Sequence, residues 1–229
     1  MPFSIYRSDI RQVSADAVVL PSNSALQING GAAYAVATIA GLQQLQESCN
    51  KLGICPVGSS VATPAFGFPA KHLIHTVGPA WDNSDTCKIK LVEAYQSALD
   101  LSFELQANSV AMPLISAGVR GCPESTSLHI ALSVVKDFLD LHPDMQIDLV
   151  LFSDKATKAG RSLYPQLAEF IDSETYQLYA ASDRRPRFSN AASVQPCPSA
   201  EPAPQAAQKM GLFSSIPLFS NGQEKQRYK

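Results

Sequence analysis

The residues from Pro113 to Gly121 have the composition of an anion-binding loop. An apolar run ends at Ile115, and small residues and two glycines follow it, namely Ser116, Ala117, Gly118, Val119, Arg120 and Gly121. Pro123 stands where a helix would begin. Consecutive backbone N–H groups in such a loop, together with the positive end of a helix, can hold a diphosphate without any lysine. Taken alone, the same pattern is also that of an ordinary turn between a strand and a helix.

Two side chains have the chemistry to recognise a heterocyclic base. Asp9 follows a short N-terminal strand expected at residues 3–6, and its carboxylate can accept a hydrogen bond from an exocyclic amine. Phe152 ends the last expected strand, and stacking of a base on an aromatic ring is worth about 1–3 kcal/mol. The alternatives are an aspartate that caps a surface turn and a phenylalanine that belongs to the core.

A polar residue and a glycine pair follow another expected strand, at residues 17–20. The carboxamide of Asn23 would face the end of the sheet where ligands bind. Gly30 and Gly31 would allow the backbone to approach a ligand closely, because a Cβ would hinder it. The alternative for the glycines is a turn that starts a helix in the alanine-rich run 32–40.

These residues need a sheet to bring them together. Short apolar runs at 17–20, 73–77, 110–115 and 147–152 predict buried strands. Helical periodicity lies between them, for example at 91–105 and 128–139, and a last helix is expected at about 158–171, with Pro165 inside it. Alternating strands and helices predict an α/β fold with a largely parallel sheet that is covered on both faces.

Composition excludes several classes of protein. The 229 residues are 45% hydrophobic and carry a net charge of −2, so no broad cationic field is available for a nucleic acid. The five cysteines form no C-x-x-C pair, which argues against a zinc ribbon or a disulfide framework. No apolar stretch approaches the roughly 20 residues of a membrane span, and no N-terminal leader is recognisable. We expect a cytoplasmic protein; export by a C-terminal or receptor-read signal stays open.

Four segments together resemble the macro-domain family over residues 3–172. Residues 8–10 and 15–19 are similar to its Gly-Asp-Ile and Ala-Asp-Ala-Ile-Val, and residues 23–31 to its Asn-Ala-Ala-Asn-Ser-x-Leu and glycine-rich loop. Residues 75–81 are close to His-x-Val-Gly-Pro-x-Trp, and residues 113–121 to Pro-x-Ile-Ser-Thr-Gly-x-Tyr-Gly. The order and spacing of the segments match as well.

The resemblance implies a three-layer α/β/α fold around a mostly parallel mixed sheet, and a site for ADP-ribose with neither a metal nor a cofactor. Asp9 would bind the adenine amino group, the backbone N–H of Ile10 a ring nitrogen, and Phe152 the adenine face. Residues 116–121 would hold the diphosphate, and Asn23, Gly30 and Gly31 the distal ribose.

Three departures from the family pattern affect hydrolysis more than binding. Ala33 occupies the place of an aspartate that many hydrolytic members have, and Leu20 that of the first asparagine. Arg120 stands where an aromatic residue usually flanks the distal ribose, and its guanidinium can instead pair with a phosphate or a carboxylate.

Three functions are therefore considered. The first is a mono-ADP-ribosyl hydrolase or O-acyl-ADP-ribose deacylase, in which Asn23 and Gly31 position the ribose. The second is a non-catalytic reader that binds mono-ADP-ribosylated proteins, and the third is a nucleic-acid or structural module on the same fold, which the charge disfavours.

The expected domain covers residues 1–180, and the composition changes after it. Residues 184–208 are rich in Pro, Ala, Ser and Gln and predict a flexible linker. Leu212-Phe213-Ser214 is echoed at residues 218–220 before a basic end. This 181–229 tail is either a docking segment for a protein partner or an apolar tail without a partner.

Overall fold

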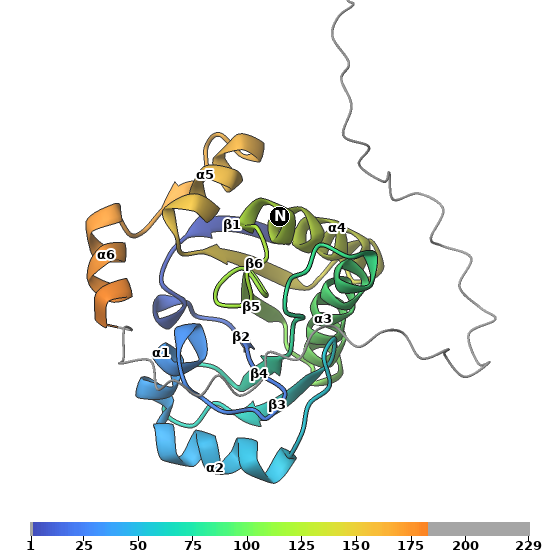
Figure 1. Cartoon of the computed structure of the whole chain (residues 1–229), viewed down its shortest axis with the longest axis vertical. Coiled ribbons are helices and arrows are strands. Elements are labelled where there is room, and N and C mark those ends of the chain that lie inside the picture. The colour runs from blue at the N-terminus through green and yellow to red at the C-terminus, as the bar shows by residue number, and fades with distance from the viewer. Residues whose placement is uncertain (1, 183–229) are drawn as a thin grey trace, which may run out of the picture. The chain divides into compact units, whose positions relative to one another are not determined.

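The computed structural model describes residues 2–182, and its centre is a seven-stranded sheet of order β3-β4-β2-β5-β6-β1-β7 (Figure 1). The strands are β1 (Phe3–Arg7), β2 (Ala17–Pro21), β3 (Ser60–Pro64), β4 (His72–Thr76), β5 (Ser109–Pro113), β6 (Gln146–Leu151) and β7 (Ala168–Glu169). Every pairing is parallel except that of β3 with β4, so the predicted mixed, mostly parallel sheet is confirmed.

Helices cover both faces of this sheet. They are η1 (Ile10–Gln12), α1 (Gly31–Ala40), α2 (Leu42–Leu52), α3 (Asp85–Glu104), α4 (Glu124–Leu141), α5 (Asp154–Leu163) and α6 (Ser173–Ser182). Figure 1 shows α1 and α2 on one side of the sheet and α3 and α4 on the other. The α/β/α layering is therefore as predicted.

The side chains of β2 explain why both faces are covered. Val19 packs in the core cluster beneath α3 and α4, whereas Val18 and Leu20 pack in the cluster beneath α1. Successive side chains of a strand point to opposite faces, so an uninterrupted apolar run needs a helix layer on each side.

One predicted helix was wrong in its position. The stretch expected at 158–171 is instead α5, which begins at Asp154 and ends at Leu163, followed by β7. The Ser153 hydroxyl caps the start by accepting the Ala156 N–H. Pro165 disfavours a helical conformation at Tyr164, whose φ of −129° and ψ of 84° end the helix.

No helix within residues 2–182 is long and apolar enough to span a membrane. The predicted linker, the repeated Leu-Phe-Ser segment and the basic end all lie outside the described residues. The boundary predicted at residue 180 falls inside the last described helix, α6.

Candidate ligand-binding site

Five strands end at the same edge of the sheet. β1, β2, β4, β5 and β6 run parallel, so the residues that follow them meet there. Those residues are 8–10, 22–23, 77–79, 114–121 and 152–153. All four segments that resemble one family contribute to this edge, which is where open α/β sheets bind ligands.

The loop after β5 presents free donors. Among the described residues, the N–H groups of Ala117, Gly118 and Val119 donate no hydrogen bond, and Val119 is fully exposed. The loop is nevertheless fixed, because Cys122 N–H donates to the Ser116 carbonyl (3.0 Å) and Ser116 Oγ to the Pro79 carbonyl (2.8 Å). A rigid loop with consecutive unpartnered amides is suited to an anion.

A buried hydroxyl pair holds the start of this loop. The Tyr95 hydroxyl accepts the Ile115 N–H (2.8 Å), and Ser127 Oγ donates to the Ile115 carbonyl (2.7 Å). The two hydroxyls are 2.7 Å apart, so Tyr95 donates to Ser127. Burial raises the pKa of Tyr95, which keeps this phenol protonated as the network requires.

Gly78 allows the loop after β4 to pack against the loop after β5. A Cβ at this position would lie 2.3 Å from Ser116 Oγ and 2.5 Å from Ile115 Cγ2. Real Cβ atoms do not approach that closely, so only glycine permits this packing.

Arg120 links the loops after β2 and β5. Its Nη2 donates to the Ser22 carbonyl at 3.2 Å, and its own carbonyl accepts the Trp81 N–H at 2.8 Å. Burial lowers the pKa of this arginine, which stays charged at neutral pH. The guanidinium therefore lies beside the residue that precedes Asn23.

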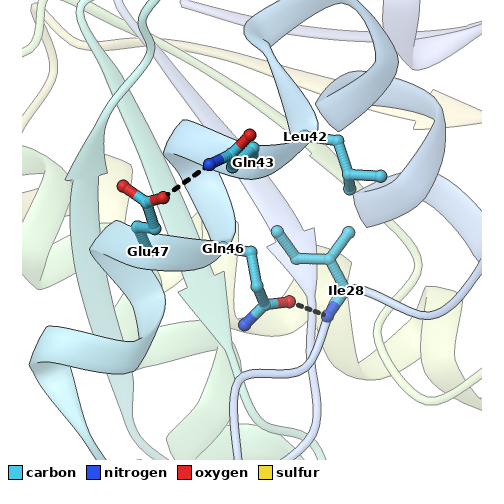
Figure 2. Close-up of a pocket in the computed structure, with 5 residues that line it drawn as sticks. All are labelled: Ile28, Leu42, Gln43, Gln46 and Glu47. Carbon is cyan, nitrogen blue, oxygen red and sulfur yellow. Dashed lines mark hydrogen bonds between the residues drawn. The ribbon is translucent and has the colours of Figure 1, made fainter.

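Two carboxamides hold the segment between β2 and α1. Asn23 accepts the Gln27 N–H (3.0 Å) and donates to the Gln27 carbonyl (2.7 Å). Gln46 of α2 accepts the Ile28 N–H (2.9 Å), as Figure 2 shows, and donates to the Leu26 carbonyl (3.2 Å). The Asn23 carboxamide that was predicted to meet a ligand is thus engaged with its own loop in the structure described.

The predicted glycine pair begins α1. Gly31 has a left-handed φ of 59°, which favours glycine, and Gly30 is extended. A Cβ added at either residue would meet nothing within 4 Å. The space in front of this turn is open.

Asp9 is held more tightly than the sequence indicated. It is buried, caps η1 through the Arg11 N–H (2.8 Å) and accepts the Arg11 guanidinium, with Nη2 2.5 Å from Oδ2. An adenine amine would therefore share this carboxylate with Arg11. The neighbouring Ile10 is buried in the cluster with Ala33 and Val36 of α1.

Phe152 is half-buried, and its ring forms a T-shaped pair with that of Tyr176 in α6, with centroids 5.0 Å apart. Ser8 N–H donates to the Leu151 carbonyl at 2.9 Å, so the segments that carry Asp9 and Phe152 lie side by side. The base-recognition residues predicted from the sequence are therefore neighbours.

Comparison with known proteins agrees with this geometry. The Macro domain family model matches residues 19–131. An O-acetyl-ADP-ribose deacetylase of Escherichia fergusonii is 35% identical over 169 residues, which are 71% of this chain and 94% of the relative. The chain belongs to the macro-domain family.

Two further similarities concern longer relatives and solved structures. The ADP-ribose glycohydrolase MACROD2 of Xenopus laevis is 37% identical over 151 residues, or 65% of this chain, but the match spans only 36% of that relative. A Trypanosoma brucei macrodomain in complex with ADP-ribose has a TM-score of 0.65 and 27% identity, with 71% of this chain and 68% of that chain covered.

Two of the three positions that depart from the family pattern are apolar and buried in this macro domain. Leu20 and Ala33 are 0% and 6% exposed and belong to one core cluster. Neither offers a polar group to the distal end of the site. Arg120 is the charged side chain that the structure brings to this end.

Sequence reasoning missed the residues that support the macro-domain site. Arg11 contacts Asp9, and its proximity to Asp9 was visible in the sequence. Gln46 holds Ile28 in the loop between Asn23 and Gly30, and Tyr95 holds Ile115, the residue before the loop of 116–121; both come from distant parts of the chain. Cys122, which lies near the start of α4, is buried, and burial raises the pKa of its thiol to about 12. It is therefore no thiolate at neutral pH.

A hollow of about 450 Å³ borders the loop between β2 and α1 and is lined by Ile28, Leu42, Gln43, Gln46 and Glu47 (Figure 2). It contains none of the predicted ligand residues. Within residues 2–182, no three His, Cys, Asp or Glu side chains are grouped to hold a metal ion.

Proposed function

We propose that this macro domain binds ADP-ribose, free or attached to a protein, across the carboxyl edge of its sheet. The observation that carries the proposal is the run of unpartnered amides at Ala117, Gly118 and Val119 on a loop that is otherwise fixed. The diphosphate would accept hydrogen bonds from these amides and from the N-terminal end of α4.

The two ends of the ligand follow from the loops on either side. Adenine would lie against Phe152, with its amine on Asp9 and a ring nitrogen on the Ile10 N–H. The distal ribose would lie at Asn23 and at the open turn of Gly30 and Gly31. Ligand hydroxyls would then take over hydrogen bonds that Asn23 makes to Gln27 in the structure described.

Calorimetric titration tests the binding site. We expect ADP-ribose to saturate at one ligand per chain and to bind more tightly than AMP, which lacks the distal ribose. Asp9→Asn keeps an acceptor for the Arg11 N–H but removes the charge, and it should weaken ADP-ribose binding about tenfold. Asp144→Ala, at an exposed carboxylate, should have no effect. Absence of heat with ADP-ribose at millimolar concentration would refute the proposal.

We further propose that, when ADP-ribose is bound as an ester of an acidic side chain or of an acyl group, this macro domain hydrolyses the ester. The support is the 35% identity to a relative named as a deacetylase. Hydrolysis needs an oriented water, stabilisation of charge at the anomeric carbon and a proton for the leaving group. Ala33 supplies no carboxylate, so a phosphate oxygen of the substrate would orient the water, and Asn23 would hold the ribose.

Release of ADP-ribose from a glutamate-linked mono-ADP-ribosylated protein tests this second step. The wild type should release product, and Asn23→Ala should release at least tenfold less at saturating substrate. Tight binding by the wild type without any product would instead identify a reader of ADP-ribosylated proteins.

A further inference from the structure

Glu124 has a carboxylate oxygen with an unmet hydrogen-bonding requirement. This residue is the first of α4 and directly follows the loop with the unpartnered amides. Its Oε1 accepts the Ser153 hydroxyl at 2.6 Å. Its Oε2 is buried and has no hydrogen-bond partner within the described residues. A buried acceptor left without a donor costs about 1–3 kcal/mol, and more when it is charged.

Ser153 fixes the position of this carboxylate. Its hydroxyl accepts the Ala156 N–H at 3.0 Å as the cap of α5, so its one proton is directed to Glu124. The start of a helix also favours a negative charge, which explains why Glu124 is tolerated there. Oε1 and the backbone are thus anchored, and Oε2 is the atom that lacks a donor.

The place of Glu124 in the fold identifies the donor it would meet. On one side lies Ser153, which directly follows Phe152, the residue proposed to stack on adenine. In the chain, Glu124 follows closely after the amides of 117–119, which are proposed to hold the diphosphate. In ADP-ribose the adenosine ribose joins the base to the diphosphate, so it must lie between these two positions, and its 2′ and 3′ hydroxyls are donors.

We propose that Glu124 is a specificity-determining residue whose Oε2 accepts a hydrogen bond from a hydroxyl of the adenosine ribose. This inference rests on the proposed function. It selects ligands with free ribose hydroxyls and disfavours a 2′-phosphate, because a second negative charge beside the buried carboxylate is repelled. The loss of the hydroxyl leaves the buried oxygen unpaired, which is the strongest basis for discrimination between polar ligands.

The test uses the full chain with ADP, 2′-deoxy-ADP and 3′-deoxy-ADP, because these ligands isolate the adenosine end. In the wild type, at least one deoxy ligand should bind about tenfold more weakly than ADP. In Glu124→Ala all three should bind alike. Glu93→Gln, at an exposed carboxylate that pairs with Lys90, should keep the wild-type ratios.

Charge is tested with Glu124→Gln, which keeps the shape of the side chain. ADP-ribose 2′-phosphate should bind this variant at least tenfold more tightly than it binds the wild type. Melting temperatures show whether the variants fold, and a purely structural role for Glu124 would weaken every ligand by the same factor. Equal ratios in wild type and both variants would overturn the inference alone. A wild type that binds neither ADP nor ADP-ribose would overturn the proposed function and this inference with it.

Discussion

His75 is a buried base whose two ring nitrogens are both engaged. Nε2 lies 3.0 Å from Thr63 Oγ1 and Nδ1 lies 3.4 Å from Ser22 Oγ, the residue before Asn23. Burial lowers its pKa from about 6.5 to about 4, so the ring is neutral over most of the physiological range. It supports the loop after β2 without adding charge to it.

This neutral ring makes stability depend on pH. Below about pH 6.5 His75 binds a proton in the unfolded chain, whereas in the folded chain the same ring stays neutral until about pH 4. The free energy of unfolding should therefore fall as the pH drops through this window, by about 3 kcal/mol from His75. Urea unfolding at about pH 7 and about pH 4.5 measures this fall, and His75→Gln should lose about 2–3 kcal/mol less than the wild type. His129→Gln on α4 is the control, and equal losses in all three proteins would contradict the prediction.

Gly78 and Gly118 form a matched pair for substitution by alanine. A Cβ at residue 78 would collide with Ser116 and Ile115, whereas at residue 118 it would meet nothing within 4 Å. Gly78→Ala should lower the free energy of unfolding by about 1–3 kcal/mol. Gly118→Ala should leave it within about 0.5 kcal/mol but weaken ADP-ribose binding, because the methyl group stands beside the proposed diphosphate amides. The prediction fails if urea unfolding finds the two variants equally stable.

At the scale of elements, α2 positions the loop that leads to α1. The Gln46 carboxamide both accepts from Ile28 and donates to Leu26, and it also donates to Asn50 at 2.9 Å. A helix that was not predicted from the sequence thus fixes the segment between Asn23 and Gly30. The position of the turn at Gly30 and Gly31 therefore depends on these hydrogen bonds of Gln46.

Replacement of Gln46 should therefore affect one end of the ligand only. Gln46→Met keeps the size of the side chain and removes both hydrogen bonds to the loop. ADP-ribose affinity should fall about three- to tenfold, whereas that of ADP, which lacks the distal ribose, should stay within twofold. Gln43→Met is the control, because Gln43 lies on the same helix and, within residues 2–182, its side chain bonds only to Glu47. Calorimetry that finds the same loss for both ligands would show that Gln46 serves general stability instead.

The elements that could be predicted from the sequence are those in which the local hydrophobic pattern matches the burial of the side chains in the structure. Buried parallel strands such as β2 are continuous apolar runs, and α4 has a wide apolar stripe that begins after Pro123. β3 was missed because Ser60 and Thr63 dilute its apolar pattern, and its antiparallel pairing with β4 comes from tertiary contacts. In α5 the capping serine decided the start, four residues before the expected one at Lys158.

The candidate site could be predicted where the residues that are proposed to contact the ligand are consecutive in the sequence. The loop of 116–121 and the glycine pair are visible as small residues after strands. The side chains that hold Ile28 and Ile115, namely Gln46 and Tyr95, were not, because a hydrogen bond between residues far apart in the chain leaves no mark on local sequence. Glu124 is another residue whose partner is distant, because Ser153 lies after β6, between that strand and α5.

At the scale of the whole molecule, charge separates ADP-ribose binding from nucleic-acid binding. The chain carries 18 Lys and Arg against 20 Asp and Glu, a net charge of −2. The proposed diphosphate site uses backbone amides, and Arg120 is a cationic side chain in the same loop. Anion recognition here therefore relies on oriented dipoles at short range and not on a long-range cationic field.

Salt should accordingly have little effect on ADP-ribose binding. Between about 50 and 300 mM NaCl we expect the dissociation constant to rise less than threefold, because few counterions are released and the amide contacts are short compared with the Debye length of about 8–10 Å. Arg120→Gln should flatten even this small dependence. The measurement is calorimetry with ADP-ribose, alongside a fluorescent polynucleotide that we expect not to bind. Steep salt dependence together with polynucleotide binding would identify a nucleic-acid module, because only multiple phosphate contacts by Lys and Arg produce such a slope.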